Sequence, residues 1–286
     1  MAGTLATVET LTGASAGPLA ESARALNLPS TTTEAIAPPV APAAPRVDLA
    51  AAVSAAEDTG NRGDINMGVA VGDVATGEVA PGSDPDGTFY TASLAKLFVA
   101  VDLVQRQRAG ELRLGDRDLR LLRAALTVSS DEAMNALWTQ YDGPGAITRV
   151  TRALDMDDTS PPEDTSQWGE VLTTPRDMVK LLRHIQVDLP APDRDLILGN
   201  MSQAQRTAGD GFDQGFGFLD GSRVPVKQGW LCCLGSRANL HSVAVLDGRF
   251  LVAVMTDEPP GYGPARQAVD AAAQTVRRDL GPARAG

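Results

Sequence analysis

The chain has 286 residues, a net charge of −11 and an isoelectric point near 4.7. Hydrophobic residues make up 43% of it and charged residues 21%, which is enough to bury the core of one large domain or two small ones. The acidic balance argues against a protein that binds nucleic acid or anionic lipid, because both classes need a basic surface. No apolar run in the sequence reaches the roughly 18 residues of a transmembrane helix.

Residues 1–46 differ in composition from the rest of the chain. The stretch "LPSTTTEAIAPPVAPAAPR" within them is crowded with Pro, Ala and Thr and has no periodic apolar face. Such tracts stay extended or disordered, so we expect a spacer here. The N-terminus lacks the pattern of a signal peptide, but spacers of this kind are common in exported proteins. We therefore expect a secreted or surface-tethered protein that acts outside the cytoplasm.

The apolar period divides the remaining chain into three parts. An Ala-rich helix from Val47 is followed by alternating apolar residues over 65–71 and by a turn at "ATG", which together predict a helix and a hairpin. Residues 93–185 are mostly helical in pattern, with a break at "VSS". The stretches "VPVKQGW" and "LHSVAVLDGRFLVAVMT" then predict strands with a tight hairpin at "LDGR", and "GPARQAVDAAAQTVRRDL" predicts a last helix.

This order of elements predicts an α+β fold. Its antiparallel sheet takes its first and last strands from opposite ends of the chain, and the N- and C-terminal helices flank the sheet. An all-helical lobe is inserted between these parts. We expect a domain over 47–286, with an α/β lobe formed by 47–92 and 222–286 and a helical lobe formed by 93–221. A cleft between two lobes is a common place for an active site.

The stretch "YTASLAKLFVA" places Ser93 and Lys96 three residues apart, where polar sequence gives way to an apolar helix. Residues i and i+3 of a helix share a face, and the first helical turn has unpaired backbone N–H groups. A buried, neutral lysine amine can take the serine proton there and activate the hydroxyl as a nucleophile. The alternative is a serine that caps the helix and a lysine that is solvated.

The stretch "VSSDEAMNALW", residues 128–138, places a second serine at the start of a helix. Ser129 with Glu132 three residues later fits a capping box, which satisfies backbone N–H groups and needs no chemical role. The alternative is that the Ser129 hydroxyl faces the cleft and relays a proton to a leaving group.

The stretch "VKQGW", residues 226–230, has a lysine and a glycine inside a predicted strand. Glycine within a strand marks a bulge or the close approach of another backbone. Lys227 is then a candidate for binding a substrate carboxylate, and Gly229 lets substrate lie along the strand edge. The Trp230 N–H could be half of an oxyanion hole. An exposed lysine on an edge strand is the alternative.

In this order and layout, the three motifs resemble the penicillin-recognising serine enzymes, the superfamily of class A β-lactamases and penicillin-binding proteins. The resemblance covers about 47–280 and is greatest to the β-lactamase-like serine hydrolases of actinobacteria. It implies that the S-x-x-K motif carries the acylated nucleophile, that an SDN-like box follows on a later helix, and that a K-T-G-like strand binds substrate.

On the helices, the resemblance makes Ser93 the nucleophile and Lys96 its base. Ser129 matches the first position of the SDN box, and Ser130 is the rival if the register slips by one. Asp131 stands where the family usually has asparagine. A carboxylate close to Lys96 favours the charged amine and raises its pKa, which would make Lys96 a poorer base.

On the later strand, Lys227, Gln228 and Gly229 match the K-T-G sequence. Gln228 replaces the threonine that would help to hold a substrate carboxylate, and it can still donate a hydrogen bond through a longer side chain. The backbone N–H groups of Ser93 and Trp230 would form the oxyanion hole.

The sequence departs from class A enzymes in the loop that supplies the base for deacylation. The corresponding stretch, "PPEDTSQWGEVLTTP", has no E-x-x-L-N motif. Glu163 and Glu170 lie in this stretch, but their spacing does not show that either one reaches the site. Without a positioned base an acyl-enzyme would persist, so we expect slow deacylation.

The chain has few residues for redox or metal chemistry. Cys232 and Cys233 are adjacent, and because a disulfide strains so short a loop, we expect unbridged cysteines on a strand. His184 and His241 are the two histidines of the sequence, and we expect both to be structural. A zinc site is not indicated.

The sequence therefore predicts a serine hydrolase that forms an acyl-enzyme on a β-lactam or a D-alanyl-peptide-like carbonyl. We expect a monomer that needs no cofactor and binds neither metal nor nucleic acid. The alternative is a non-catalytic module that keeps the fold and binds cell-wall peptide or a protein.

Overall fold

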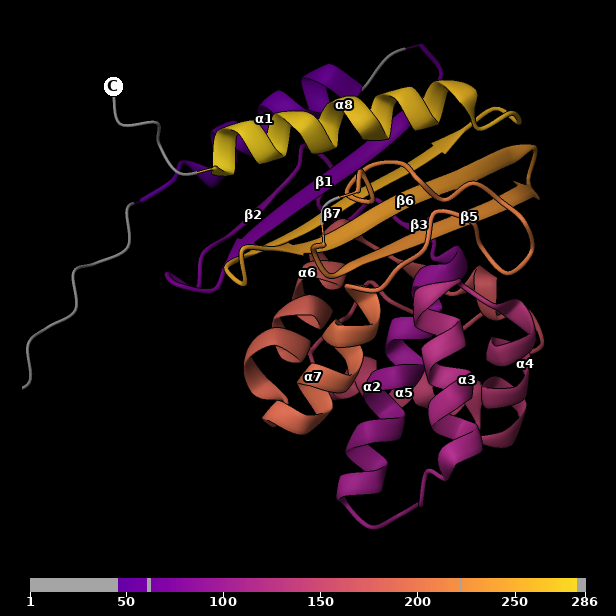
Figure 1. The fold of residues 1–286 in the computed structure, drawn as a ribbon. Coiled ribbons are helices and arrows are strands. Elements are labelled where there is room, and N and C mark those ends of the chain that lie inside the picture. Colours follow the sequence, from indigo (N-terminus) through magenta and orange to yellow (C-terminus); the bar gives the residue numbers. More distant parts are fainter. Residues whose placement is uncertain (1–45, 61–62, 222, 282–286) are drawn as a thin grey trace, which may run out of the picture. The chain divides into compact units, whose positions relative to one another are not determined.

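The computed structural model describes residues 46–60, 63–221 and 223–281, and a five-stranded antiparallel sheet crosses it (Figure 1). The strand order is β2-β1-β7-β6-β5. Met67 of the first strand lies opposite Thr256 of the last, so strands from the two ends of the chain pair as predicted. The strands of this sheet are β1 (Asn66–Asp73), β2 (Val79–Pro81), β5 (Val226–Leu234), β6 (Arg237–Leu246) and β7 (Phe250–Glu258).

Two helices, α1 (Leu49–Gly60) and α8 (Gly263–Leu280), cover one face of this sheet (Figure 1). Apolar residues recur at helical spacing on α1, where Leu49, Val53 and Ala56 are buried against α8 and the sheet. The prediction that the N- and C-terminal helices flank the sheet is thus confirmed. The spacer expected over 1–46 lies outside the described residues except for Arg46, and the predicted lobe boundaries stay a prediction.

The helical lobe lies on the opposite face of the sheet (Figure 1). Its central helix is α2 (Ala95–Arg108), in which every residue from 95 to 104 is buried. No helix in the described part of the chain is both long and apolar enough for a membrane span. The other helices are α3 (Asp116–Thr127), α4 (Asp131–Gln140), α5 (Gly143–Ala153), α6 (Pro175–Arg183) with its π-helical extension η3 (His184–Asp188), and α7 (Ala191–Met201).

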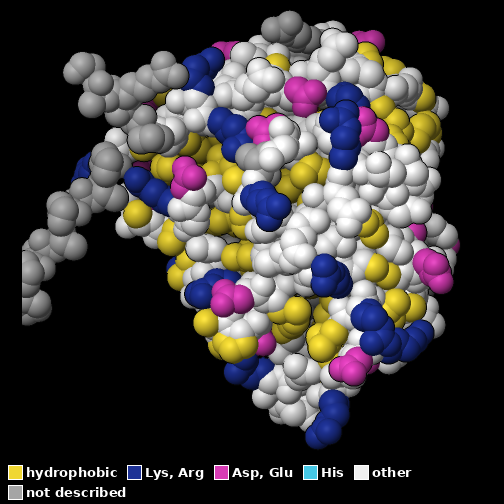
Figure 2. Space-filling view, viewed as in Figure 1, with side chains coloured by type: hydrophobic (Ala, Val, Ile, Leu, Met, Phe, Trp, Pro, Cys, Tyr) yellow, Lys and Arg dark blue, Asp and Glu magenta, His cyan; other side chains and the backbone are white. Residues whose placement is uncertain are grey.

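A small two-stranded sheet brings two distant loops together. Its strands, β3 (Phe89–Tyr90) and β4 (Leu172–Thr173), pair in antiparallel orientation. As a result, the 3-10 turn η1 (Ala92–Leu94), which follows β3, lies beside the 3-10 turn η2 (Trp168–Glu170), which precedes β4. On the face of the molecule shown in Figure 2, Lys and Arg side chains are interspersed with Asp and Glu side chains.

Candidate active site

Ser93 lies in the turn η1, which leads directly into α2. Ser93 is only 3% exposed, and it borders a cavity. Ala92, immediately before it, has φ of 48°, a left-handed conformation that residues with a Cβ rarely adopt. Such backbone strain is often found where a reactive side chain has to be held in a fixed orientation. The structure thus places Ser93 at the first turn of the helix, as the sequence predicted.

Lys96 lies one turn further along, with its amine directed at Ser93. Its Nζ donates hydrogen bonds to Ser93 Oγ at 2.6 Å and to Asp131 Oδ1 at 2.8 Å. Burial lowers the pKa of Lys96 to about 8, although the Asp131 carboxylate acts in the opposite direction. The expected effect of Asp131 is therefore present, but desolvation outweighs it. A useful fraction of the amine is neutral at mildly alkaline pH, as a general base requires.

Ser129 and Ser130, the two serines between which the sequence left the register open, have different hydrogen-bond partners. Ser130 is the N-cap of α4, since its side chain accepts a hydrogen bond from the Ala133 N–H at 3.2 Å. The capping interaction therefore belongs to Ser130 and not to Ser129. Ser129, with φ of 55°, is buried, and its Oγ accepts a hydrogen bond from Lys227 Nζ at 2.5 Å.

Lys227, which donates this hydrogen bond to Ser129, is almost fully buried, with 1% of its surface exposed. It also donates to the carbonyl oxygen of Gln228 at 2.7 Å. Burial, followed by the nearby positive charge of Lys96, holds the pKa of Lys227 well below its ordinary value. In this arrangement Lys227 contacts the Ser129 hydroxyl and is not among the residues that line the cavity, and its expected contact with a substrate carboxylate stays a prediction.

The Gln228 side chain points away from the cavity. Its amide nitrogen donates to the carbonyl oxygens of Gln214 and Phe216, on the other side of β5. Successive side chains of a strand alternate between its two faces, so Gln228 cannot share the face that Lys227 uses to reach Ser129. This placement differs from the expected hydrogen bond between Gln228 and substrate.

Gly229 allows β5 to approach the turn that carries Ser93. A Cβ at this position would lie 2.9 Å from the carbonyl oxygen of Thr91 and 3.2 Å from the Leu94 side chain. The sequence analysis expected the glycine to mark a close approach of another backbone, and the structure shows that this backbone is the one leading into η1. It also brings Trp230 to the cavity, with its ring stacked on Phe212 at 4.7 Å between centroids. The proposed oxyanion hole stays a prediction.

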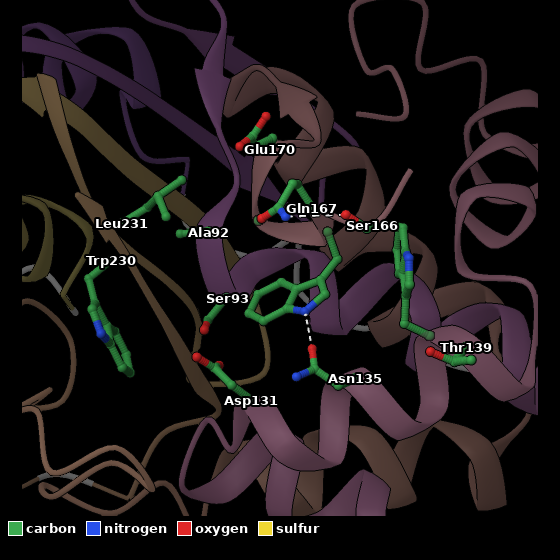
Figure 3. Close-up of a pocket in the computed structure, with 13 residues that line it drawn as sticks. Ala92, Ser93, Asp131, Asn135, Thr139, Ser166, Gln167, Glu170, Trp230 and Leu231 are labelled. Carbon is green, nitrogen blue, oxygen red and sulfur yellow. Dashed lines mark hydrogen bonds between the residues drawn. The ribbon is translucent and has the colours of Figure 1, made fainter. Parts of the chain in front are cut away.

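The cavity beside Ser93 has a volume of about 580 Å³ (Figure 3). Two residues that the sequence analysis missed form one of its walls: the Trp168 indole N–H donates to Asn135 Oδ1 at 2.7 Å. The sequence did contain a sign of this role, because a large apolar tryptophan is unusual in a loop as polar as "TSQWGE". The lining residues are Ala92, Ser93, Asp131, Asn135, Trp138, Thr139, Ser166, Gln167, Trp168, Gly169, Glu170, Trp230 and Leu231.

The two glutamates considered for deacylation lie apart from the serine. Glu163 is exposed, and Glu170 lines the cavity with its carboxylate away from Ser93 (Figure 3). Within the described residues, neither glutamate forms a hydrogen bond with Ser93 or Lys96. Asp131 is therefore the carboxylate nearest to the chemistry, through its contact with Lys96.

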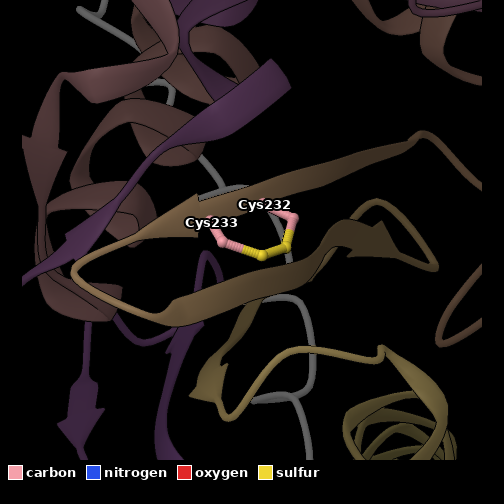
Figure 4. The surroundings of a disulfide bond; sticks show 2 residues. All are labelled: Cys232 and Cys233. Carbon is pink, nitrogen blue, oxygen red and sulfur yellow. A yellow bond between two sulfur atoms is a disulfide. The ribbon is translucent and has the colours of Figure 1, made fainter.

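The expectation that the two cysteines stay unbridged is wrong. Cys232 and Cys233 lie on β5 as predicted, but they are joined by a disulfide (Figure 4). The register of β5 against β6 shifts between Cys232 and Leu234. At such an irregularity the side chains no longer alternate regularly across the strand, which the sequence pattern did not show.

The two histidines lie outside the cavity lining, in keeping with their expected structural roles. His241 is fully buried, with Nε2 at 2.7 Å from the Tyr90 carbonyl oxygen and Nδ1 accepting from the Thr256 N–H at 3.2 Å. These partners assign the proton to Nε2. His184 contacts Gln105 at 2.9 Å in the helical lobe.

Known proteins are similar to this chain in both sequence and fold. A family model described as "Beta-lactamase enzyme family" matches residues 48–118 and 119–280. A Mycobacterium tuberculosis protein named "Putative lipoprotein LppW" is 33% identical over 254 residues, which cover 85% of this chain and 80% of that protein.

Solved structures show the same fold at low sequence identity. A class A beta-lactamase from Mycobacterium abscessus is 20% identical with a TM-score of 0.59, and the match covers 82% of this chain and 100% of that one. The structure of PBP-A is 15% identical with a TM-score of 0.62, and the match covers 79% of this chain and 93% of that one.

Proposed function

The chain belongs to the beta-lactamase enzyme family, and from this premise we propose that it is a serine hydrolase that works through an acyl-enzyme on Ser93. One observation carries the proposal: the buried Lys96 amine, with its lowered pKa, lies 2.6 Å from Ser93 Oγ. An amine in this state can accept the serine proton while the oxygen attacks a carbonyl carbon.

In the proposed acylation, Ser93 Oγ bonds to the carbonyl carbon as its proton passes to Lys96. The bond to the leaving nitrogen then breaks, and Ser129 gives that nitrogen its proton. The proton held by Lys96 then passes to Ser129 and restores its hydroxyl, so that one proton has moved in all, from Ser93 to the leaving nitrogen. Lys227 holds the Ser129 hydroxyl in place through the 2.5 Å hydrogen bond. Water then cleaves the ester on Ser93.

The substrate we propose is a β-lactam or a D-alanyl-peptide-like carbonyl. The backbone N–H groups of Ser93 and Trp230 would stabilise the developing oxyanion, and Gly229 would keep β5 close enough for that. Asp131 would tune Lys96 and does not replace a water-activating glutamate, since it is already paired with the amine. We therefore propose that the acyl-enzyme is hydrolysed slowly.

The name of the Mycobacterium tuberculosis relative supports a proposal about cellular location. Because that protein is described as a lipoprotein, we propose that this chain also acts outside the cytoplasm, tethered to a surface or secreted. A wall-peptide substrate would be accessible there. The alternative of a non-catalytic module is tested by the same experiment as the chemistry.

The test is intact-protein mass spectrometry after incubation with benzylpenicillin, followed over time, with Ser93→Ala as the control. We expect a mass increase equal to the whole drug in the natural protein and none in the variant. Slow loss of this adduct would support slow deacylation. If neither an adduct nor drug hydrolysis is found, and a D-alanyl-D-alanine ester also fails to acylate Ser93, the non-catalytic alternative replaces the proposal.

A further inference from the structure

A second cavity, of about 350 Å³, lies beyond the end of the Ser93 cavity and has no part in the chemistry proposed above. It lies between the small sheet β3/β4 and the end of the β5–β6 hairpin. Its walls combine apolar, hydroxyl, amide and paired charged side chains. The lining residues are Thr88, Phe89, Tyr90, Leu172, Leu234, Gly235, Arg237, Asn239 and Asp257.

Three chain segments, 88–93, 168–172 and 230–235, each contribute residues to both cavities, although no single residue lines both. The first two are paired, with the Thr91 N–H donating to the Val171 carbonyl oxygen at 2.7 Å. Leu231 lines the Ser93 cavity, and it lies directly opposite Asn239, which lines the second cavity, in the register of β5 and β6. The two cavities are therefore neighbours at this pair of residues.

The second cavity contains polar groups that lack partners within the protein. Asn239 is 2% exposed, and its Oδ1 is buried with no hydrogen bond to any described residue. The Arg237 Nε is likewise buried and unpartnered. Buried polar groups are nearly always hydrogen-bonded in native proteins, so a pair of exceptions in one cavity points to a missing partner. Asn239 lies opposite Leu231 in the register of β5 and β6.

We propose that this second cavity binds the far end of a peptide acyl group whose carbonyl carbon is attacked by Ser93. The proposal rests on the function proposed above. Lys227 is at the start of β5 and donates to Ser129, the proposed proton donor to the leaving nitrogen, whereas Leu231 is further along the strand. The acyl side of the substrate therefore extends past Leu231 toward Asn239.

The chemistry of the second cavity fits an uncharged stretch of peptide. A peptide unit offers both an N–H and a C=O, and the Asn239 amide can pair with either. Phe89, Leu172 and Leu234 supply apolar surface for a side chain. Arg237 and Asp257 form an ion pair with each other, so neither one calls for a charged ligand. A compact β-lactam would occupy the Ser93 cavity alone.

The test compares two acyl donors that end in D-alanyl-D-alanine: an acetylated dipeptide and an acetylated pentapeptide with uncharged side chains. For the natural protein, we expect kcat/KM to be about tenfold higher for the long donor. Asn239→Leu should remove this preference and leave the rate of Ser93 acylation by benzylpenicillin unchanged. Asn200→Leu, which changes a buried asparagine of α7 away from both cavities, is the matched control.

A second variant keeps the test valid if Asn239→Leu fails to fold. Leu234→Trp, at the hairpin end of β5, fills the cavity from its rim and should also abolish the preference for the long donor. Equal kcat/KM values for both donors in the natural protein, or an equal loss for both in the variants, would overturn the proposal.

Binding of the same two peptides to Ser93→Ala protein, measured by calorimetry, separates this proposal from the proposed function. Tighter binding of the long peptide that depends on Asn239, in a protein that no donor acylates, would retain the second cavity and reject the hydrolase. Acylation of Ser93 without any effect of length or of Asn239 would do the reverse.

Discussion

The indole ring of Trp168 covers the amine of Lys96, with the ring centroid 4.2 Å from Nζ. The hydrogen bond from Trp168 to Asn135 holds the ring there, and Asn135 lies one turn after Asp131 on α4. The ring has two opposing effects on the lysine pKa. Its π-face attracts the cation and raises the pKa, whereas its bulk excludes water and lowers it. Burial is the largest influence on the lowered pKa of Lys96, and the ring is part of what buries the amine, so we expect the exclusion of water to be the larger of the two effects.

Trp168→Ala should therefore slow acylation and shift its pH dependence. Water would reach Lys96, and the pKa of the amine would rise from about 8 toward its ordinary 10.5. Each unit of increase leaves about tenfold less neutral amine at pH 7. We expect the midpoint of the pH profile of benzylpenicillin acylation to move to higher pH, and Trp168→Phe, which keeps a ring, to stay near the natural value. A shift to lower pH would mean that the cation–π attraction dominates.

Asp131→Asn should shift the same profile in the opposite direction. The substitution keeps the shape of the side chain but removes the charge that raises the Lys96 pKa. The midpoint should then fall below about 8, and acylation below neutral pH should become faster relative to its maximum. The rate of adduct formation from pH 5.5 to 9.5 measures this, with Glu132→Gln on the same helix as a charge-matched control. An unchanged midpoint would show that Asp131 has no electrostatic effect on the base.

Ser129→Ala and Ser130→Ala should give opposite results, although the two serines are neighbours. Loss of the Ser129 hydroxyl removes the proposed proton relay, together with one acceptor of the buried Lys227 amine, and should slow acylation by roughly 100-fold or more. Loss of the Ser130 hydroxyl removes the N-cap of α4 and should lower the free energy of unfolding by about 1 kcal/mol, with little change in acylation. Adduct formation and urea denaturation distinguish them. If Ser130→Ala is the slower variant, the assignment is reversed.

Local sequence patterns were enough to predict much of the fold and part of the site. The i, i+3 spacing of Ser93 and Lys96 on an apolar helix places the two groups together without long-range information. The placement of Gln228 could also have been predicted, because the period of a strand forbids Lys227 and Gln228 from facing the same way. The family resemblance instead suggested that Lys227 and Gln228 bind the same substrate carboxylate.

Other features depend on contacts that no local pattern contains. Trp168 reaches Lys96 only because β3 pairs with β4 and brings η2 beside η1. The disulfide of Cys232 and Cys233 lies where the register of β5 against β6 shifts, and the alternation of apolar residues in the sequence does not show this shift. The second cavity is formed by residues from four stretches far apart in sequence, 88–90, 172, 234–239 and 257, so no local pattern marked Asn239 as a binding residue.

Stability at low pH should depend on His241. Its ring is buried, and burial lowers its pKa from 6.5 to about 4, while the nearby Asp257 carboxylate opposes the shift. Above pH 6.5 the histidine is neutral in the folded and unfolded chains. Between pH 6.5 and 4 the unfolded chain binds a proton that the folded protein rejects, so stability falls as the pH falls. The shift corresponds to a loss of about 3 kcal/mol across this window.

The measurement is urea denaturation at several pH values between 7.5 and 4.5 for the natural protein and for His241→Gln. The variant should be less stable at pH 7.5, because it loses the fitted ring that joins Tyr90 and Thr256, but its stability should fall less between pH 6.5 and 4.5. His184→Gln, at the other histidine of the chain, is the control and should keep the natural slope. If His241→Gln loses as much stability over this window as the natural protein, another group causes the acid sensitivity.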